Sequence, residues 1–437
     1  MSHEFPTPDC LTRAANIHEE TYGTPGTISG HAPGVWVTIG EHIDTFGGLA
    51  LLHHVEQRVA VVASPREDST VAVTASFAAS LSDSSTQGTT VSESATFKEA
   101  THAIQEQSPH ADEHGQRIEP PMPKGGLALR LAAVALNLMQ RGVLSRESTG
   151  FNITVVSELP QGSGFYELAA MDAAFAVAAA SRLNDRNEPP IRLKLAEACI
   201  SAADSIAAFP AVCSVYHVLL RSQGTGMSVM NHADGALTQT PSMVGRNFSL
   251  VAARSPEGGL LDVPEEEAAE QQRIRQRFVS KASHAFGVDY VNLLPDATAR
   301  VIQWLEANHQ VLGPEGWPST HEAAAWLRFW GGESERASTL LSAIRALDFP
   351  TASRLINAST EALNTDYGIA GTAIPLGQLL LKQGADSARP AAPGRSRTVA
   401  AVVPNENVTE VLDYLADAGI EATKVATLST LWRATEA

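Results

Sequence analysis

A strand that ends in a polar cluster is the sequence feature that most constrains the fold of this chain. Residues 34–40 read GVWVTIG, with apolar side chains at alternate positions and β-branched and aromatic residues throughout, which predicts a strand. Glu41, His42 and Asp44 follow directly, and two consecutive glycines then mark a sharp turn. Three polar groups held at the end of a strand suit a site for a hydroxylated ligand.

A second strand leads into a glycine-rich turn and a helix. Residues 151–158, FNITVVSE, predict a strand, and the apolar run that follows the turn predicts a helix at 166–180. Free N–H groups of a first helical turn, together with a glycine-rich loop, can cradle a phosphate. The same pattern is equally typical of a plain strand-to-helix connection, so both interpretations stay open. The candidate loop residues are Gly162, Ser163 and Gly164.

Strands and helices alternate along the rest of the chain, which predicts an α+β fold with helices over one face of a sheet. Residues 69–124 are rich in Ser, Thr and His, and we expect weak strands at best and mostly surface structure there. Further helices are predicted at 11–23, 127–142, 195–209, 263–287, 336–347, 351–363 and 407–419, and further strands at 57–65, 397–404 and 423–429.

Length and charge limit the domain organisation and the class of ligand. A chain of 437 residues is longer than a single hydrophobic core ordinarily organises, so we expect two domains, at 1–220 and 221–437. The net charge of −17 repels polyanions and argues against a nucleic-acid or anionic-membrane partner. Three widely spaced cysteines indicate neither a disulfide framework nor a zinc site, and no segment has the pattern of a signal peptide or a membrane span. We therefore expect a soluble protein of the reducing cytoplasm.

Residues 12–68 resemble the start of a galactokinase, a member of the GHMP small-molecule kinase superfamily, whose signature in this region is APGRVNLIGEHTDYNGG. Residues 159–178, LPQGSGFYELAAMDAAFAVA, resemble more loosely the second family motif, PLGSGLSSSASLEVA, and residues 351–370 also look like galactokinase. The resemblance implies a two-domain GHMP-kinase-like fold with a ligand cleft between the domains. It also implies that Glu41, His42 and Asp44 bind hydroxyls of a galactose-like sugar.

The chain departs from this family at the positions that would handle phosphate. Val35 stands where the family has an arginine, and Val215 stands where alignment on a shared proline places the family aspartate. Residues 165–168 replace the family serines, and the bulky Tyr166 among them is expected to fill part of the nucleotide site. The third motif, a glycine run in the family, reads AAPGRS at 391–396, where a proline and side chains replace glycines.

Because phosphoryl transfer depends on positioning and charge stabilisation, these replacements favour a galactokinase homologue with its catalytic positions lost. The leading hypothesis is a pseudokinase that binds a galactose-like sugar and acts as a sensor or regulatory partner. One alternative is an active galactokinase with rearranged catalysis, which would use ATP and Mg²⁺. Another is a vestigial scaffold that acts through protein–protein contacts.

Three further clusters allow a functional and a structural interpretation. A basic turn could restore positive charge near the third motif, although a solvated turn is favoured; it contains Arg389, Arg395 and Arg397. Two acids near the start of the helix at 166–180, Glu167 and Asp172, could bind a metal, although a first-turn acid is first of all a helix-dipole effect. A histidine-rich tract is predicted to be a loop rather than a metal site; it contains His102, His110, Asp112, Glu113 and His114.

Overall fold

The chain divides into two compact units that are not simple halves of the sequence. The first unit comprises residues 1–35, 55–223 and 432–437, and the second comprises 36–54 and 224–431. The computed structural model describes residues 9–83, 85–108, 110–111, 117–118, 120–123, 125–222, 226–245, 247–254, 264–369, 371, 373–428 and 435–436. Each unit is described by itself below.

The first unit is built on a mixed β-sheet. Its strands are β1 (Ile28–Ile39), β2 (Leu49–Pro65), β3 (Thr70–Ala78), β4 (Gln87–Thr96), β7 (Phe151–Ser157) and β14 (Thr435–Glu436). They lie in the order β14-β1-β2-β7-β3-β4, and β3 and β7 run parallel, with Val73 opposite Ile153. The β-branched residues of β2 and β7 pair in the centre, where Val61 lies opposite Val155. Both β1 and β2 continue beyond the limits of this unit into the second.

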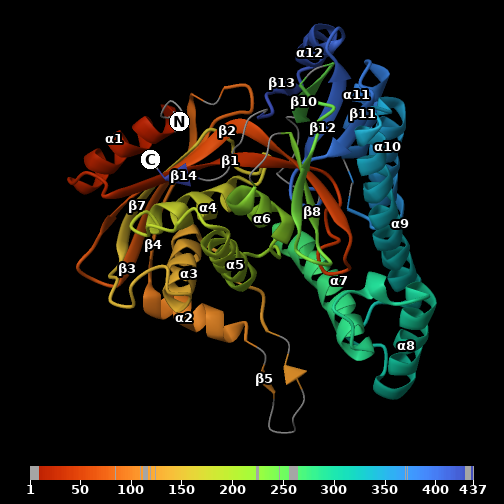
Figure 1. Ribbon diagram of the computed structural model, residues 1–437, viewed down its shortest axis with the longest axis horizontal. Coiled ribbons are helices and arrows are strands. Elements are labelled where there is room, and N and C mark those ends of the chain that lie inside the picture. Colours follow the sequence, from red (N-terminus) through yellow and green to blue (C-terminus); the bar gives the residue numbers. More distant parts are fainter. Residues whose placement is uncertain are drawn as a thin grey trace. The chain divides into compact units, whose positions relative to one another are not determined.

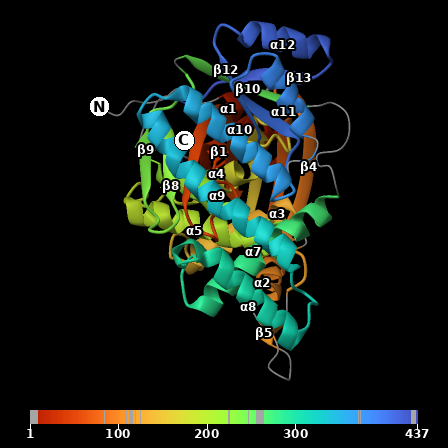
Figure 2. The ribbon, with the colours of Figure 1, turned by 90° about the vertical axis from the view of Figure 1, so that its right-hand side faces the viewer.

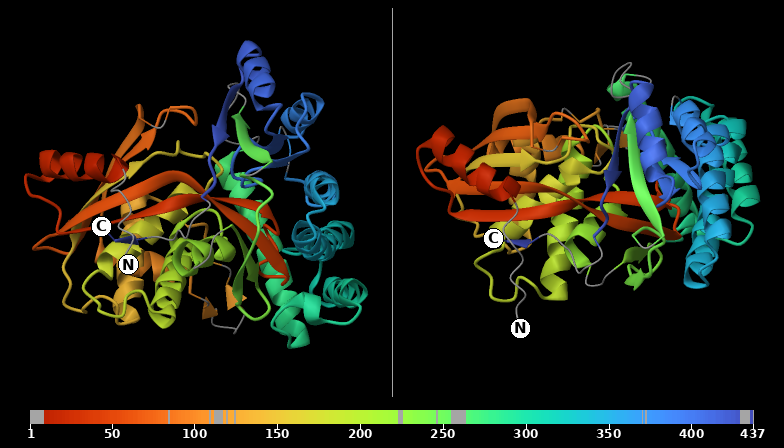
Figure 3. Two further views of the ribbon diagram at one scale, coloured as in Figure 1. Left: turned by 45° about the horizontal axis from the view of Figure 1, so that its top comes forward. Right: turned by 90° about the horizontal axis from the view of Figure 1, so that it is seen from above.

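Helices cover both faces of this sheet. Helix α1 (Asp9–Tyr22) lies on one face, and α3 (Leu127–Gln140), α4 (Glu167–Ala179), α5 (Pro189–Ile206) and α6 (Cys213–Arg221) lie on the other (Figure 1; Figure 3, left). Alternate residues of β2 point toward α1, since Ala60 and Val62 belong to one core cluster with Leu11 of α1. Helix α4 approaches β1 closely at Gly30, where a Cβ atom would lie 2.5 Å from the Ala174 carbonyl oxygen.

The second unit contains a separate four-stranded antiparallel sheet. Its order is β11 (Ser387–Pro390), β12 (Thr398–Pro404), β10 (Phe248–Arg254) and β13 (Glu421–Val425). Helices α11 (Ala373–Lys382) and α12 (Val408–Asp417) pack against it through Leu380, Val411 and Leu415. Two more strands, β8 (Met227–Asn231) and β9 (Leu237–Thr240), form a hairpin whose first strand pairs with residues 49–52 of β2.

A helical layer completes the second unit. It consists of α7 (Glu265–Phe286), the 3₁₀ turn η1 (Val291–Leu293), α8 (Ala297–Leu312), α9 (Thr320–Arg345) and α10 (Phe349–Thr365). Helices α9 and α10 run side by side (Figure 2). The core of this layer is aromatic: Trp330 of α9 stacks on Phe278 of α7 with ring centres 6.5 Å apart, and Tyr367, just after α10, stacks on Phe329 of α9 at 4.4 Å. A Ser319–Glu322 capping box starts α9.

The predicted α+β fold is confirmed, but helices cover both faces of the first unit's sheet and not one face as predicted. Two local predictions are also wrong. Residues 69–124 contain two long strands, β3 and β4, and the helix α2 (Phe97–Glu106), besides the short β5 (His110–Ala111) and β6 (Arg117–Ile118). The alternately buried residues of β3 are Val71, Val73, Ala75 and Phe77, and the Ser, Thr and Ala residues between and beside them dilute the hydrophobic signal. The helix predicted to start at 336 starts at Thr320, because Gly331 and Gly332 lie inside α9 without ending it.

Among the described ranges, no helix combines the length and the apolar character that crossing a bilayer requires.

Candidate functional site

The polar turn after β1 belongs to the second unit, and its first carboxylate is internal. Glu41 has 0% exposure, and its Oε2 accepts a hydrogen bond from Nη1 of Arg389 over 2.9 Å. The same guanidinium lies 3.6 Å from a carboxylate oxygen of Glu333, which in turn accepts a hydrogen bond from the Ser359 hydroxyl over 2.8 Å. Glu41 is therefore held in a buried charge network that reaches α9, α10 and β11.

The preferred interpretation of the basic turn is wrong for Arg389. Its side chain has 0% exposure rather than lying in solvent, because two buried carboxylates, Glu41 and Glu333, compensate its charge. Arg395 is partly exposed and donates from Nε to the side-chain oxygen of Gln272 over 3.1 Å.

His42 occupies a strained backbone position and has a defined tautomer. Its φ of 65° lies in the left-handed region, which non-glycine residues rarely adopt. Its Nε2 lies 3.2 Å from the Pro393 carbonyl oxygen, which only accepts, so the proton is on Nε2 and Nδ1 remains an acceptor. Burial lowers the pKa of His42 well below its usual range, and the charges of Arg395 and Arg389 lower it further. The imidazole is therefore neutral at physiological pH.

Asp44 is partly exposed and lies in a turn that the structure fixes tightly. The turn closes through a hydrogen bond from Gly47 N–H to the Ile43 carbonyl oxygen at 2.7 Å, and Asn292 N–H donates to the Phe46 carbonyl oxygen at 3.1 Å. A side chain at Gly47 is disfavoured, because its φ of 97° strains other residues and a Cβ atom would lie 2.5 Å from Oδ1 of Asn292. The structure thus brings the three predicted sugar residues onto one rigid turn, with Glu41 internal and His42 and Asp44 partly exposed.

His232 is a neighbour of this turn that sequence reasoning missed. It directly follows β8, and its backbone N–H donates to the Gly48 carbonyl oxygen over 2.9 Å. Burial lowers the pKa of His232, while the negative charge of Asp44 acts in the opposite direction. A single histidine after a strand carries no spacing signal, so only the pairing of β8 with β2 reveals this neighbour.

The glycine-rich loop at the start of α4 belongs to the first unit, and one of the chain's own carboxylates binds it. Oε1 of Glu167 accepts from the Gly162 N–H over 2.7 Å, and Oε2 accepts from the Ser163 hydroxyl over 3.0 Å. Burial raises the pKa of Glu167, and these hydrogen bonds oppose the rise. Tyr166, with φ of 58°, precedes the helix as its N-cap residue and is partly exposed. The loop is anion-binding in character, and Glu167 supplies the anion.

Asp172, the second acid proposed as a metal ligand, forms a different contact. Its Oδ2 lies 2.6 Å from Nη2 of Arg130 and accepts a hydrogen bond from the Tyr216 hydroxyl over 2.8 Å. All three side chains are buried. Within the ranges that the structure describes, no three His, Cys, Asp or Glu side chains are grouped so as to hold a metal ion.

Val35 and Val215 are core residues of the first unit. Each has 0% exposure, and Val35 takes part in hydrogen bonding only through its backbone, whose N–H donates to the Phe165 carbonyl oxygen over 2.9 Å. Val215 lies in the first turn of α6. An isopropyl group at either position offers neither charge nor a proton-transfer group.

The histidine-rich tract is only partly described. His102 lies on α2 and pairs with Glu106, with 3.4 Å between Nε2 and Oε1. His110 lies in the two-residue strand β5. Asp112, Glu113 and His114 lie outside the described residues.

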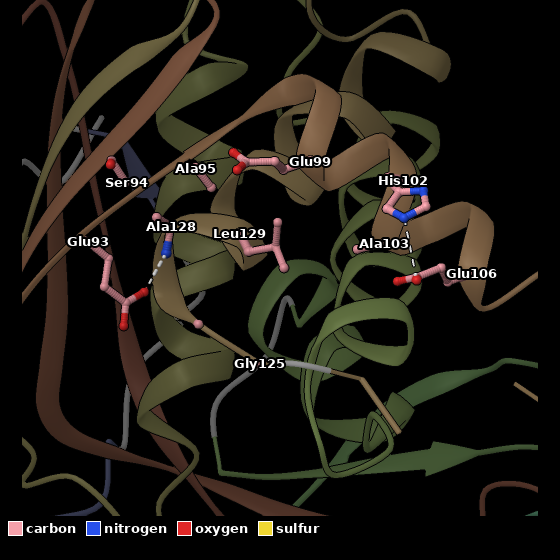
Figure 4. Close-up of a pocket in the computed structure, with 11 residues that line it drawn as sticks. Glu93, Ser94, Ala95, Glu99, His102, Ala103, Glu106, Gly125, Ala128 and Leu129 are labelled. Carbon is pink, nitrogen blue, oxygen red and sulfur yellow. Dashed lines mark hydrogen bonds and ion pairs between the residues drawn. The ribbon is translucent and has the colours of Figure 1, made fainter. Parts of the chain in front are cut away.

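A cavity of about 440 Å³ opens in the first unit between α2, β4 and the start of α3. Figure 4 shows Glu93 turned toward the backbone of Ala128, and His102 beside Glu106. Glu93 accepts hydrogen bonds from the first two N–H groups of α3, at 2.6 and 3.2 Å. Because Glu99 also lines this cavity, its polar lining is mainly carboxylate. Such a lining disfavours an anionic ligand.

Comparisons with known proteins agree with this architecture. The galactokinase galactose-binding signature matches residues 16–65. The structure of Lactococcus lactis galactokinase complexed with galactose matches with a TM-score of 0.70 and 17% identity, over 97% of this chain and 99% of that one. Methanococcus jannaschii mevalonate kinase matches with a TM-score of 0.55 and 10% identity, over 92% and 98%. The structure of L. major mevalonate kinase in complex with R-mevalonate matches with a TM-score of 0.53 and 11% identity, over 92% of this chain and 96% of that one. No curated protein matches the sequence significantly.

The fold is that of the GHMP small-molecule kinases. Within that class the chain is galactokinase-like, since it carries the galactose-binding signature and has the fold of a galactokinase over nearly its whole length. The resemblance seen in the sequence is thereby confirmed.

Proposed function

We propose that this protein binds a galactose-like sugar through the turn after β1 and does not transfer phosphate. It would then act as a sugar-responsive sensor or regulatory protein, with its effect passed to a protein partner. The sugar half of the proposal is supported by the signature match over residues 16–65, which includes Glu41, His42 and Asp44.

The observation that carries the second half is the contact between Glu167 and its own loop. A nucleotide phosphate would need the donors of this loop, and the Gly162 N–H and Ser163 hydroxyl already bind the Glu167 carboxylate. A fixed negative charge at this place also repels a phosphate. The loop as folded therefore does not fit a nucleotide phosphate, and the proposed function involves neither ATP nor Mg²⁺.

Two further features support the absence of phosphate transfer. The positions where the resemblance expects a cation and a carboxylate hold Val35 and Val215, both fully buried. Removal of a single charge-stabilising donor commonly costs about 10²–10³ in rate. The cavity between α2 and α3 presents carboxylates, which suits a polyphosphate poorly.

The three signature residues have different proposed roles. Asp44 is partly exposed, so its carboxylate oxygens would accept hydrogen bonds from sugar hydroxyls. The neutral His42 would offer Nδ1 as an acceptor while Nε2–H holds Pro393. Glu41 would act through its buried pair with Arg389, which fixes the end of β1 and hence the turn.

Isothermal titration calorimetry with D-galactose, with and without MgATP, tests the proposal. We expect saturable heat from galactose alone and no added heat from MgATP. Asp44→Asn should weaken galactose binding by about 10–100-fold, since hydrogen bonds to charged groups contribute about 1.5–3 kcal/mol. The matched control is Asp413→Asn, an exposed acid on α12, which should bind as the wild type does.

The other possible results are distinct. Sustained heat that requires both galactose and MgATP would mean turnover, and the protein would be an active galactokinase with rearranged catalysis. No heat with galactose or with related hexoses would refute sugar binding and would favour a scaffold acting through protein contacts.

A further inference from the structure

Helix α9 contacts the sugar turn, residues 40–48, through two buried side chains. Oε1 of Glu333 accepts a hydrogen bond from the Gly40 N–H over 3.2 Å, directly before the signature residues. The ring of Trp330 stacks on that of Phe46 with ring centres 5.9 Å apart. Because Glu333 and Trp330 are both buried, this contact is part of the core of the second unit.

A third contact joins the same face of α9 to the end of the turn. A Cβ atom at Gly48 would lie 2.6 Å from the hydroxyl oxygen of Ser334, so the backbone of the turn lies directly against this side chain. Positions 330, 333 and 334 lie on one face of the helix, because side chains three and four positions apart are neighbours. One face of α9 therefore contacts the turn from its first residue to its last.

The sugar turn is closed by its own hydrogen bonds. The N–H groups of Phe46 and Gly47 both donate to the Ile43 carbonyl oxygen, at 3.0 and 2.7 Å. Any displacement of this turn by a ligand therefore moves it as a unit and reaches its contacts on α9. Glu333 connects the turn to α10 as well, since its Oε1 also accepts from the Ser359 hydroxyl over 2.8 Å.

Two consecutive glycines lie between the contact residues of α9. Gly331 and Gly332 separate Trp330 from Glu333 in the interior of this 26-residue helix, where glycine is among the least favourable residues. Packing does not require glycine at 331, because a Cβ atom there would meet no atom of the described residues outside its own stretch of helix within 4 Å. At 332 a Cβ atom would meet the end of the flexible Arg336 side chain, at 2.8 Å. Since kinks in helices commonly occur at glycines, α9 is easiest to bend where the turn contacts it.

We propose that sugar binding at the turn is transmitted to α9 through Glu333 and Trp330, and that α9 bends in response at Gly331–Gly332. This inference rests on the proposed sugar-binding function, and it names α9 as the element through which the sensor changes shape. The sugar produces this change because it binds the bent state more tightly than the continuous helix.

Tryptophan fluorescence during a D-galactose titration tests the transmission. We expect galactose to change the emission of the wild type and not that of Trp330→Phe, which keeps an aromatic ring against Phe46. Calorimetry should show that Trp330→Phe still binds galactose. The matched control is Trp317→Phe, since Trp317 packs on Trp304 in the same unit, and this variant should keep the emission change.

Gly331→Ala tests the hinge. Alanine favours the continuous helix, so we expect calorimetry to show about fivefold weaker galactose binding than in the wild type. The matched control is Gly377→Ala in α11, where a Cβ atom would lie at an ordinary distance of 3.7 Å from Cβ of Ala388. This control should bind galactose as the wild type does, and circular dichroism would check that each variant is folded.

The inference and the sugar function can fail separately. Calorimetric binding of galactose without an emission change in the wild type would overturn the inference and leave the sugar function standing. An emission change that persists in the folded Trp330→Phe, or equal galactose affinities of Gly331→Ala and the wild type, would do the same. If calorimetry shows no galactose binding by the wild type, the sugar function fails and this inference fails with it.

Discussion

The Glu167 carboxylate accepts a hydrogen bond from the backbone N–H of Gly162 over 2.7 Å, at the N-terminus of α4. A helix N-terminus preceded by a glycine-rich loop is ready to bind an anion, and here the anion comes five residues later in the same chain. The first property to test is therefore whether an added anion can compete with the Glu167 carboxylate for the N–H groups of this loop.

Replacing Glu167 with serine should make the loop available to an added anion. Glu167→Ser frees the Gly162 N–H and removes a buried negative charge. We expect pyrophosphate to bind the variant at least about tenfold more tightly than the wild type, which corresponds to one charge-assisted hydrogen bond. Calorimetry with sodium pyrophosphate would measure both proteins. The control is Glu188→Ser, an exposed acid at the start of α5. Equal pyrophosphate binding by wild type and Glu167→Ser would contradict this account of the loop.

Restoring the charged residues that the resemblance expects should not restore activity. Val35→Arg and Val215→Asp, alone or together, should release no ADP in a coupled assay with galactose and MgATP. Each should also lower the free energy of unfolding by several kcal/mol, since the positions have 0% exposure and an unpaired buried charge costs about that much. Val311→Arg, at an 81% exposed position on α8, is the control and should be nearly neutral. Galactose-dependent ADP release by either variant would show that the catalytic deficit lies in these two side chains.

The buried pair between Arg389 and Glu41 should be costly to break from one side. Arg389→Met leaves the buried Glu41 without its cation, while Glu333 keeps its pair with Arg336, and we expect a loss of about 3–5 kcal/mol in unfolding free energy. Arg328→Met removes an exposed partner of Asp366 and should cost about 1 kcal/mol or less. Urea denaturation of both variants would measure the difference. Similar costs for the two would mean that the Arg389 network has little energetic importance.

Acid should destabilise the protein through His53. Burial lowers its pKa to about 3, while its ring binds the hydroxyls of Thr38 and Ser242 at 3.0 and 2.7 Å. In the unfolded chain His53 takes up a proton near pH 6.5, whereas in the folded chain it does not. The contribution of His53 to the free energy of unfolding is therefore fully present above pH 6.5 and is lost as the pH decreases toward 3. Between pH 6.5 and 5 the loss from this group is about 2 kcal/mol. Urea midpoints at these pH values should show a smaller decrease for His53→Gln, while His321→Gln, at an exposed position, should follow the wild type.

Much of the fold follows from local patterns in the sequence. The sequence predicts the strand β7, the helix α4 and the long helix α7 with acids in its first turn, because hydrophobic periodicity decides such elements. The strands β3 and β4 were missed, since Ser, Thr and Ala dominate them and β4 is largely exposed. β4 pairs with β3, and β3 joins the rest of the sheet through β7, which comes about 70 residues later in the chain and leaves no local signal.

The candidate site was predictable only where it is contiguous. Glu41, His42 and Asp44 lie within one motif, so the sequence displays them together. Their partners Arg389 and His232 come from distant elements, and only the folded chain reveals them. Glu167 was visible as a first-turn acid, but the direction of its side chain, back into the loop rather than outward, depends on packing around α4.

The separation of Glu41 from its cation also has a consequence for synthesis. Arg389 follows Glu41 by 348 residues, so at about 5–20 residues per second a ribosome needs roughly 17–70 s to deliver it. During that interval the carboxylate must stay hydrated, because without Arg389 its final position would desolvate an uncompensated charge. The turn that carries the sugar signature thus leaves the ribosome well before it can reach its final structure.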